Sequence, residues 1–117
     1  MSQYKTVTRS GKENMAKNGK MPVVTVDWER NEVRANGRVV ELALKEYLVM
    51  HMLYEAQGKV LSREHLLTEI WGYEKADLSP VLIRLIDQHV ARLRGKVGAQ
   101  CVKTVTGFGY RWMAYPK

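Results

Sequence analysis

The segment that follows Ser79-Pro80 constrains the fold of this chain more than any other. Serine is a preferred N-cap residue and proline is favoured in the first helical turn, so the pair predicts a helix that begins at Pro80. Over residues 80–97 the apolar side chains recur at helical spacing and share one stripe: Leu82, Ile86, Val90, Leu93 and Val97. We therefore expect a long amphipathic helix whose apolar stripe packs on a core.

The opposite face of this predicted helix is polar and basic. At about 100° per residue it holds Arg84, Gln88, Ala91 and Arg92, with Asp87 and Arg94 at one border. Arginine presents a fork of N–H donors to guanine or phosphate, and glutamine can pair with adenine. The pattern favours a helix that binds in the major groove of DNA, whereas an ordinary solvated surface helix explains any single arginine.

Charge is distributed unevenly along the 117 residues, and the distribution favours a polyanionic partner. Residues 1–20 carry a net charge of +4, residues 21–83 carry −3 and residues 84–117 carry +6, within a total of +7. A basic C-terminal third on an acidic body is typical of a nucleic-acid-binding protein. A solvated charged surface would account for the charge alone equally well.

A β-hairpin is predicted after the long helix. Residues 101–105 and 110–115 have the pattern of strands, and a Gly-Phe-Gly turn joins them. The two glycines of this turn would permit close approach to a phosphate or to a minor groove. Lys103 and Arg111 add positive charge to the hairpin.

The N-terminal half of the folded body is predicted to begin with a small sheet. Alternating apolar residues from Val24 to Leu42, with Asn36-Gly37 as a two-residue turn, predict three or four antiparallel strands. The last of these strands is expected to continue through Leu42.

Two further helices and a loop connect this sheet to the long helix. The first helix is expected over residues 45–57, with Gly58 as the residue that ends it. The second runs from an N-cap at Ser62 to Gly72, and residues 73–78 form a polar loop.

Residues 1–20 are almost without apolar side chains and are expected to be a disordered basic arm or linker, so that residues 21–117 form one domain. No apolar run approaches the roughly 18 residues that a membrane span needs. The single cysteine, Cys101, allows no internal disulfide. We therefore expect a cytoplasmic protein that does not bind a membrane.

The residues do not indicate catalysis, a cofactor or a metal. The three histidines and Cys101 lack metal-ligand spacing, and we expect His51 to be buried and His65 exposed. Glu41 and Glu46 are interpreted as surface carboxylates at a strand end and a helix start, rather than as an acid–base pair. The chain is therefore not expected to be an enzyme.

Several segments resemble one family. LSREHLLTEIWGY (61–73), RLIDQHVARLRGKV (84–97) and TVTGFGYRW (104–112) are similar to the winged-helix effector domain of OmpR/PhoB-type response regulators. With LALKEY (42–47), the resemblance covers residues 23–114. It implies an α+β fold, a winged helix-turn-helix with a four-stranded N-terminal antiparallel sheet, three helices and a C-terminal β-hairpin wing.

The same resemblance implies partners. It implies head-to-tail binding to direct-repeat DNA sites, and contact with RNA polymerase through loop 72–79. The receiver domain of such regulators is not found before residue 21. We therefore expect either an isolated effector domain or a stand-alone regulator.

The resemblance also implies roles for individual residues. Arg84, His89, Arg92 and Arg94 would contact phosphates or base edges, Asp87 would lie near a base, and Trp71 and Thr104 would position the DNA backbone. Together with the polar and basic residues singled out above, the candidate DNA-binding residues are Arg63, Trp71, Arg84, Asp87, Gln88, His89, Arg92, Arg94, Lys96, Lys103, Thr104 and Thr106.

Five positions depart from the family pattern. Thr106 stands where the family has a wing arginine that enters the minor groove, which removes a charge-assisted contact. Leu85 and Gln88 replace the usual Thr and Val, so base preference cannot be transferred. Ala43 replaces a capping threonine at a cost of about 1 kcal/mol unless neighbouring packing offsets it. Gly95 weakens the last turn of its helix by up to about 1 kcal/mol.

We therefore predict a sequence-specific double-stranded DNA-binding transcriptional regulator, with residues 80–97 as recognition helix and residues 101–115 as wing. The alternative is a winged-helix protein-interaction module that docks on RNA polymerase or another regulator without reading DNA. Thr106, which lacks the charge of the family's wing arginine, is consistent with this alternative. An RNA-binding domain is disfavoured because the sequence does not indicate exposed aromatic residues on a sheet face.

Overall fold

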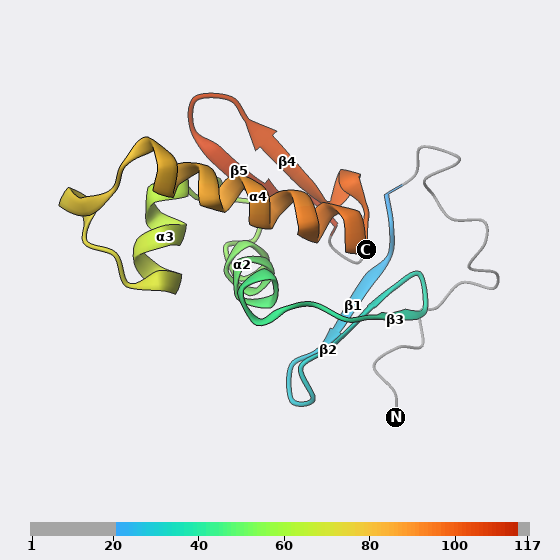
Figure 1. The fold of residues 1–117 in the computed structure, drawn as a ribbon. Coiled ribbons are helices and arrows are strands. Elements are labelled where there is room, and N and C mark those ends of the chain that lie inside the picture. The colour runs from blue at the N-terminus through green and yellow to red at the C-terminus, as the bar shows by residue number, and fades with distance from the viewer. Residues whose placement is uncertain (1–20, 115–117) are drawn as a thin grey trace.

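The computed structural model describes residues 21–114. Its elements follow in the order β1 (Val24–Asp27), β2 (Glu32–Ala35), β3 (Arg38–Val40), α2 (Leu44–Glu55), α3 (Arg63–Trp71), η2 (Lys75–Asp77), α4 (Pro80–Val97), η3 (Ala99–Cys101), β4 (Val102–Val105) and β5 (Gly109–Trp112). The predicted arm over residues 1–20 lies outside the described residues. The predicted fold class, a winged helix-turn-helix with an N-terminal sheet and a C-terminal hairpin, is confirmed (Figure 1).

The N-terminal sheet is antiparallel with the strand order β1-β2-β3. Asn36 and Gly37 have φ values of 53° and 85° between β2 and β3, the positive pair that a two-residue hairpin turn requires. In the described part of the chain this sheet has three strands, not the four that the resemblance implied. The third strand ends at Val40 instead of Leu42, because Ala43 already serves as the N-cap of α2.

Helix α2 is shifted relative to the predicted range of residues 45–57. It begins one residue earlier and ends at Glu55, with Ala56 as its C-cap. The N–H of Gln57 bonds the carbonyl of Tyr54 at 3.0 Å, and Gln57 itself has a φ of 54°. The chain therefore leaves the helix before Gly58, and glutamine, rather than glycine, takes the first left-handed position.

Helices α3 and α4 begin and end where the sequence predicted. Ser62 Oγ accepts a hydrogen bond from the N–H of His65 at 3.0 Å, and Gly72 ends α3 with a φ of 81°. Ser79 Oγ accepts from the N–H of Leu82 at 3.3 Å, with Pro80 in the first turn of α4. The segment between the two helices, predicted as a polar loop, contains the short helix η2.

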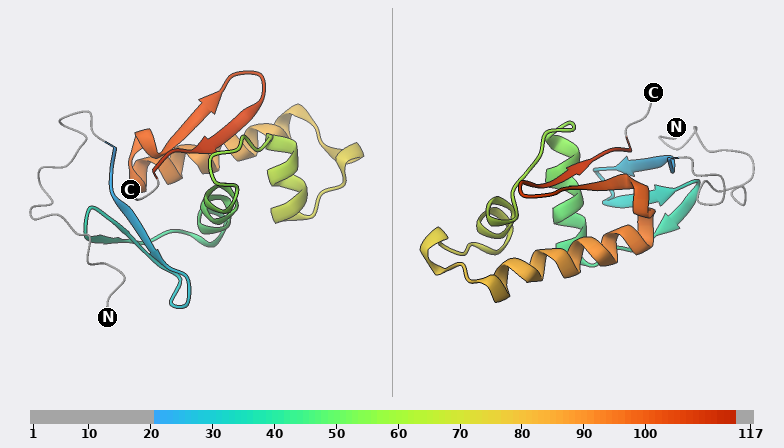
Figure 2. Two further views of the ribbon diagram at one scale, coloured as in Figure 1. Left: turned by 180° about the vertical axis from the view of Figure 1, so that it is seen from behind. Right: turned by 90° about the horizontal axis from the view of Figure 1, so that it is seen from above.

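The core lies where the three helices, the sheet and the hairpin meet. Helix α4 crosses the domain, with α2 and α3 packed against it (Figure 1), and seen from above it runs along one edge with the hairpin beside it (Figure 2). Four residues of the predicted stripe, Ile86, Val90, Leu93 and Val97, are buried there. Among the largest side chains they meet are Met50, Leu53, Leu66, Leu67 and Trp112.

The C-terminal hairpin is shorter than predicted. Cys101 belongs to η3 instead of a strand, and β5 ends at Trp112. Residue 115, the predicted end of this strand, lies outside the described residues. The hairpin is also tied to the segment before α3, because Leu61 forms an isolated antiparallel bridge with Tyr110 through bonds of 2.9 and 3.0 Å.

His51 is not buried, contrary to the prediction. Its side chain is 41% exposed, and its ring lies 4.6 Å from that of Trp28. The residue occupies the face of α2 that turns toward the β1–β2 end of the sheet, where Tyr47 and Tyr54 also contact Trp28. His65 is exposed, as predicted.

Gly95 is an exposed glycine inside α4, and replacing it with alanine should stabilise the protein. A Cβ at this position would meet nothing within 4 Å, and alanine has the higher helix propensity. We expect Gly95→Ala to raise the free energy of unfolding by up to about 1 kcal/mol, as measured by urea denaturation. A lower unfolding midpoint in the variant would contradict the structure at this turn.

Candidate nucleic-acid interface

The outward face of α4 is the first component of the candidate interface. Arg84, Gln88, Ala91 and Arg92 are all exposed, on the side of the helix opposite the buried stripe. Their placement follows from the period of the helix, since residues seven apart share a face. Val81, near the start of the helix, is 68% exposed and adds an apolar side chain to this face.

Arg94 lies at the border of this face and points to the hairpin. Its Nε and Nη2 donate to the carbonyl of Val102 at 3.0 and 2.8 Å, and Nη2 also donates to Thr104 Oγ1 at 2.7 Å. Its guanidinium lies 5.5 Å from the centre of the Tyr110 ring. The structure therefore brings together Arg94 and Thr104, two of the predicted site residues, by direct contact with one another.

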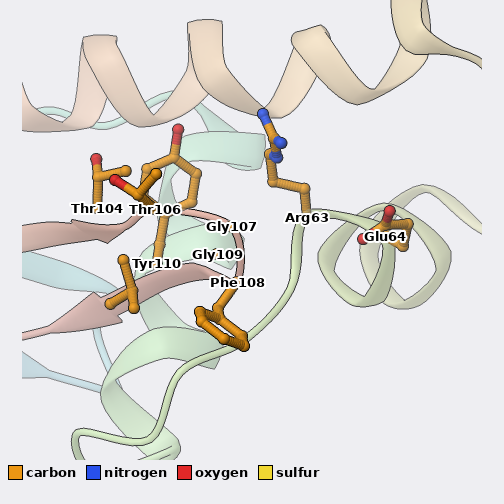
Figure 3. Close-up of a pocket in the computed structure, with 9 residues that line it drawn as sticks. Arg63, Glu64, Thr104, Thr106, Gly107, Phe108, Gly109 and Tyr110 are labelled. Atoms are coloured by element: carbon orange, nitrogen blue, oxygen red, sulfur yellow. The ribbon is translucent and has the colours of Figure 1, made fainter.

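Asp87 occupies the same border two turns earlier. Its Oδ1 accepts from Tyr110 OH at 2.6 Å, and its Oδ2 lies 3.0 Å from Arg63 Nη1 at the start of α3. Figure 3 shows the side chains of Arg63 and Tyr110 both directed toward α4. Burial, together with the hydrogen bond to the Asp87 carboxylate, raises the pKa of Tyr110 to about 12. Tyr110 therefore stays a neutral donor at physiological pH.

Lys96, another predicted DNA-binding residue, is paired with Glu46 of α2. The Nζ of Lys96 lies 2.7 Å from Glu46 Oε1, and the Glu46 side chain is 3% exposed. Glu46 is thus buried, which corrects the interpretation of it as a surface carboxylate. The same Oε1 accepts the N–H of Ala43 at 2.9 Å, which supplies one capping bond at the helix start that lacks the family's threonine.

The pKa of Glu46 gives this ion pair a pH dependence. Burial acts to raise the pKa, but the hydrogen bonds from Lys96 and Ala43 and the charges of Lys96 and Arg92 outweigh it, so the pKa lies below its ordinary value of 4.5. A carboxylate with a lowered folded-state pKa stabilises the fold above its unfolded pKa, and this stabilisation is lost as the pH falls below that value.

We therefore expect Glu46→Gln to destabilise the protein at pH 7 by about 1.5–3 kcal/mol, the value of a hydrogen bond to a charged group. The difference in free energy of unfolding between wild type and variant should shrink as the pH falls from 5 toward 3, which urea denaturation at each pH would measure. Glu41→Gln, at an exposed position, is the matched control. A difference that persists unchanged at low pH would contradict the pairing.

His89 and Trp71 form a smaller cluster on the other flank of α4. Their rings are 5.0 Å apart in an edge-on arrangement, and His89 Nδ1 lies 3.0 Å from the carbonyl of Leu85. Lys45 of α2 places its Nζ 5.2 Å from the Trp71 ring. Sequence reasoning missed Lys45, because its position within α2 carries no sign that it reaches α3.

The hairpin is the second component of the candidate interface. Lys103, Thr104 and Thr106 are exposed, and the Thr104 and Thr106 side chains point toward α4 in Figure 3. Phe108, at the turn, is 73% exposed and points away from α4. Sequence reasoning did not single out Phe108, although an aromatic residue between two turn glycines was a readable signal.

The two turn glycines differ in what they permit. A Cβ on Gly107 would meet nothing within 4 Å, whereas one on Gly109 would lie 2.0 Å from the backbone oxygen of Leu61. The prediction that both glycines serve approach to DNA is therefore wrong for Gly109, which allows the hairpin to pack against the segment before α3. Residues of the turn, with Arg63 and Glu64, line an open groove of about 260 Å³ beside it (Figure 3).

Between residues 21 and 114, no three His, Cys, Asp or Glu side chains gather closely enough to hold a metal ion. Burial raises the pKa of the Cys101 thiol to about 12, so the nucleophilic thiolate is not populated at neutral pH. None of the helices in this part of the chain is long and apolar enough to cross a membrane.

A buried three-helix core, a long helix with an exposed basic face and a hairpin beside it define a winged-helix domain. A family model described as "Transcriptional regulatory protein, C terminal" matches residues 37–112, and the chain belongs to this family. The resemblance to the effector domains of OmpR/PhoB-type response regulators is confirmed.

Individual relatives agree with this assignment. The transcriptional regulatory protein CseB of Streptomyces coelicolor is 40% identical over 89 residues, which cover 76% of this chain and 36% of CseB. The DNA-binding domain of CpxR from E. coli is 31% identical, with a TM-score of 0.66 over 80% of this chain and 92% of that one. The AdeR DNA-binding domain, solved in complex with an intercistronic region, is 27% identical, with a TM-score of 0.62 over 76% and 92% of the two chains. The chain thus corresponds to about a third of the length of CseB.

Proposed function

We propose that this domain binds double-stranded DNA sequence-specifically and regulates transcription, with α4 in the major groove. The observation that carries the proposal is the exposed face of α4, where Arg84, Gln88 and Arg92 stand free of the core while the opposite stripe anchors the helix. Side chains of these types can form hydrogen bonds to guanine, adenine and phosphate. The AdeR domain, which shares the fold, was solved with DNA.

The remaining predicted residues divide into two groups under this proposal. Lys103, Thr106 and His89 lie at or beside the exposed surface, and we assign them contacts with the DNA backbone, with Trp71 behind His89. Arg63, Asp87, Arg94, Lys96 and Thr104 are each engaged with another residue of the domain, Thr104 with Arg94. Lys96 and Arg63 would then contribute to DNA binding through their charge, rather than by a dedicated contact.

Partners and location follow from the family and are part of the same proposal. We propose head-to-tail binding to direct-repeat sites and contact with RNA polymerase through residues 72–79, where Glu74, Lys75, Ala76 and Asp77 are exposed. A regulator of this class would act in the cytoplasm and without catalysis. Residues 21–117 would form its DNA-binding domain, with residues 1–20 as an arm or linker.

The proposal is tested by the salt dependence of binding to random duplex DNA. Neutralisation of phosphates releases counterions, so log affinity should fall linearly with log salt, by about 0.9 per phosphate contacted. Selection of bound sites from a random duplex library would then give base preference and repeat spacing. Absence of binding at low salt, or a flat salt response, would instead favour the protein-interaction module.

A further inference from the structure

The hairpin is joined to α4 at two points on one flank of the helix. Asp87 and Arg94 are seven residues apart, which places them on the same side of α4 about 10.5 Å apart along its axis. Their partners, Tyr110 and Thr104, face each other as a cross-strand pair of β5 and β4. One residue of each strand is therefore held by α4, and the Arg94 guanidinium also lies over the Tyr110 ring.

The polar groups of both helix residues are largely used within this network. Arg94 directs Nε and Nη2, one edge of its fork, at the hairpin. If that edge turned to a phosphate, the Val102 carbonyl would lose both of these donors. Asp87 has one oxygen bound to Tyr110 and the other to Arg63, and a carboxylate is repelled by DNA phosphates.

We infer that Asp87 and Arg94 are positioning residues that hold the wing against the recognition helix, instead of DNA contacts as the family resemblance implied. This inference rests on the proposed function in so far as the wing is taken to meet DNA. Gly109 permits the packing on Leu61 that fixes the hairpin from its other side. The angle between the wing and the recognition helix is thus fixed in the free protein. DNA binding therefore does not lose conformational entropy in ordering the wing.

The test compares Arg94→Lys with Arg92→Lys. Both variants retain the charge, and lysine serves as a phosphate ligand through that charge. Lysine has no guanidinium group and cannot make the paired hydrogen bonds from Nε and Nη2 to Val102 and Thr104. In Arg94→Lys the wing should therefore detach from α4 more often. In the free protein, amide hydrogen exchange over residues 103–110 should accelerate about 10-fold or more relative to the amides of α2, which report global unfolding. Arg92→Lys should leave this ratio unchanged.

DNA binding supplies the second readout. Arg94→Lys should bind selected sites about 5-fold or more weakly while the salt slope keeps its wild-type value, because no phosphate contact is lost. Tyr110→Phe, which removes only the hydroxyl that binds Asp87, should accelerate wing exchange in the same way without altering charge. Should Arg94→Lys disturb the whole fold, this second variant still decides the question.

Two results would overturn the inference. One is unchanged wing exchange in both Arg94→Lys and Tyr110→Phe. The other is a salt slope reduced by about 0.9 in Arg94→Ala with wing exchange as in wild type, which would make Arg94 a phosphate contact. Failure of the wild-type protein to bind duplex DNA would reject the proposed function separately, and the exchange experiment on the free protein would still report whether the two residues hold the wing.

Discussion

Gly109→Ala is expected to lower the free energy of unfolding by about 2–6 kcal/mol, the combined range for backbone strain and overpacking. A Cβ at this position would lie 2.0 Å from the Leu61 oxygen and 2.8 Å from both Leu61 C and Ser62 Cα. All three are backbone atoms, which cannot move aside as a side-chain end can. The φ of 148° is a conformation that residues with a side chain rarely adopt.

Denaturant unfolding of Gly109→Ala and Gly107→Ala would measure this effect against a matched control. Gly107 also has a positive φ, of 85°, but a Cβ there would meet open space. Its substitution should cost about 1–2 kcal/mol from the left-handed conformation alone. The variant at 109 should therefore be the less stable of the two, and it should lose the protection of the Tyr110 amide. Equal stabilities would mean that the hairpin does not pack on Leu61 as described.

The largest expected effect on binding comes from the outward face of α4. Arg84→Ala and Arg92→Ala should each weaken binding to a selected site by about 1–3 kcal/mol, the value of a good base contact. Because both side chains are exposed, the free energy of unfolding should change by no more than about 0.5 kcal/mol. Loss of affinity without loss of stability is the signature of a contact residue.

Titration of fluorescent duplexes at several salt concentrations would separate the two kinds of contact. A phosphate-contacting arginine should reduce the salt slope by about 0.9 when removed, whereas a base-reading arginine should also relax preference at one position of the site. Arg30→Ala removes the same charge next to β1, where the side chain is 74% exposed, and should leave affinity close to wild type. Wild-type affinity in both α4 variants would reject this helix as the recognition element.

Features set by neighbouring residues were predictable from the sequence. The N-caps at Ser62 and Ser79 and the left-handed Gly72 were confirmed, because each depends on a bond or a backbone angle within four residues. The end of α2 was misjudged, since a glycine at residue 58 was taken as the decisive signal while Gln57 had already adopted positive φ. A propensity ranks residues but does not forbid the unfavourable choice.

Features set by distant residues were not predictable. Glu46 and Lys96 are 50 residues apart, and nothing in either neighbourhood indicates that they meet. The burial of Gly109 likewise depends on Leu61, which lies in a different segment. Local periodicity places a residue on a face of its own element, but it contains no information about which element covers that face.

The sequence alone determined α4: its start at Ser79-Pro80, its buried stripe and its outward arginines all follow from capping and from the period of the helix. Only the tertiary structure decided which residues at the borders of that helix remain free. Asp87, Arg94 and Lys96 looked like part of one basic, DNA-facing surface, yet they bind Tyr110, Thr104 and Glu46. The reason is that a side chain at the border of a helix face can either stay in solvent or bind an element packed beside it. Which of the two occurs depends on segments that are distant in the sequence.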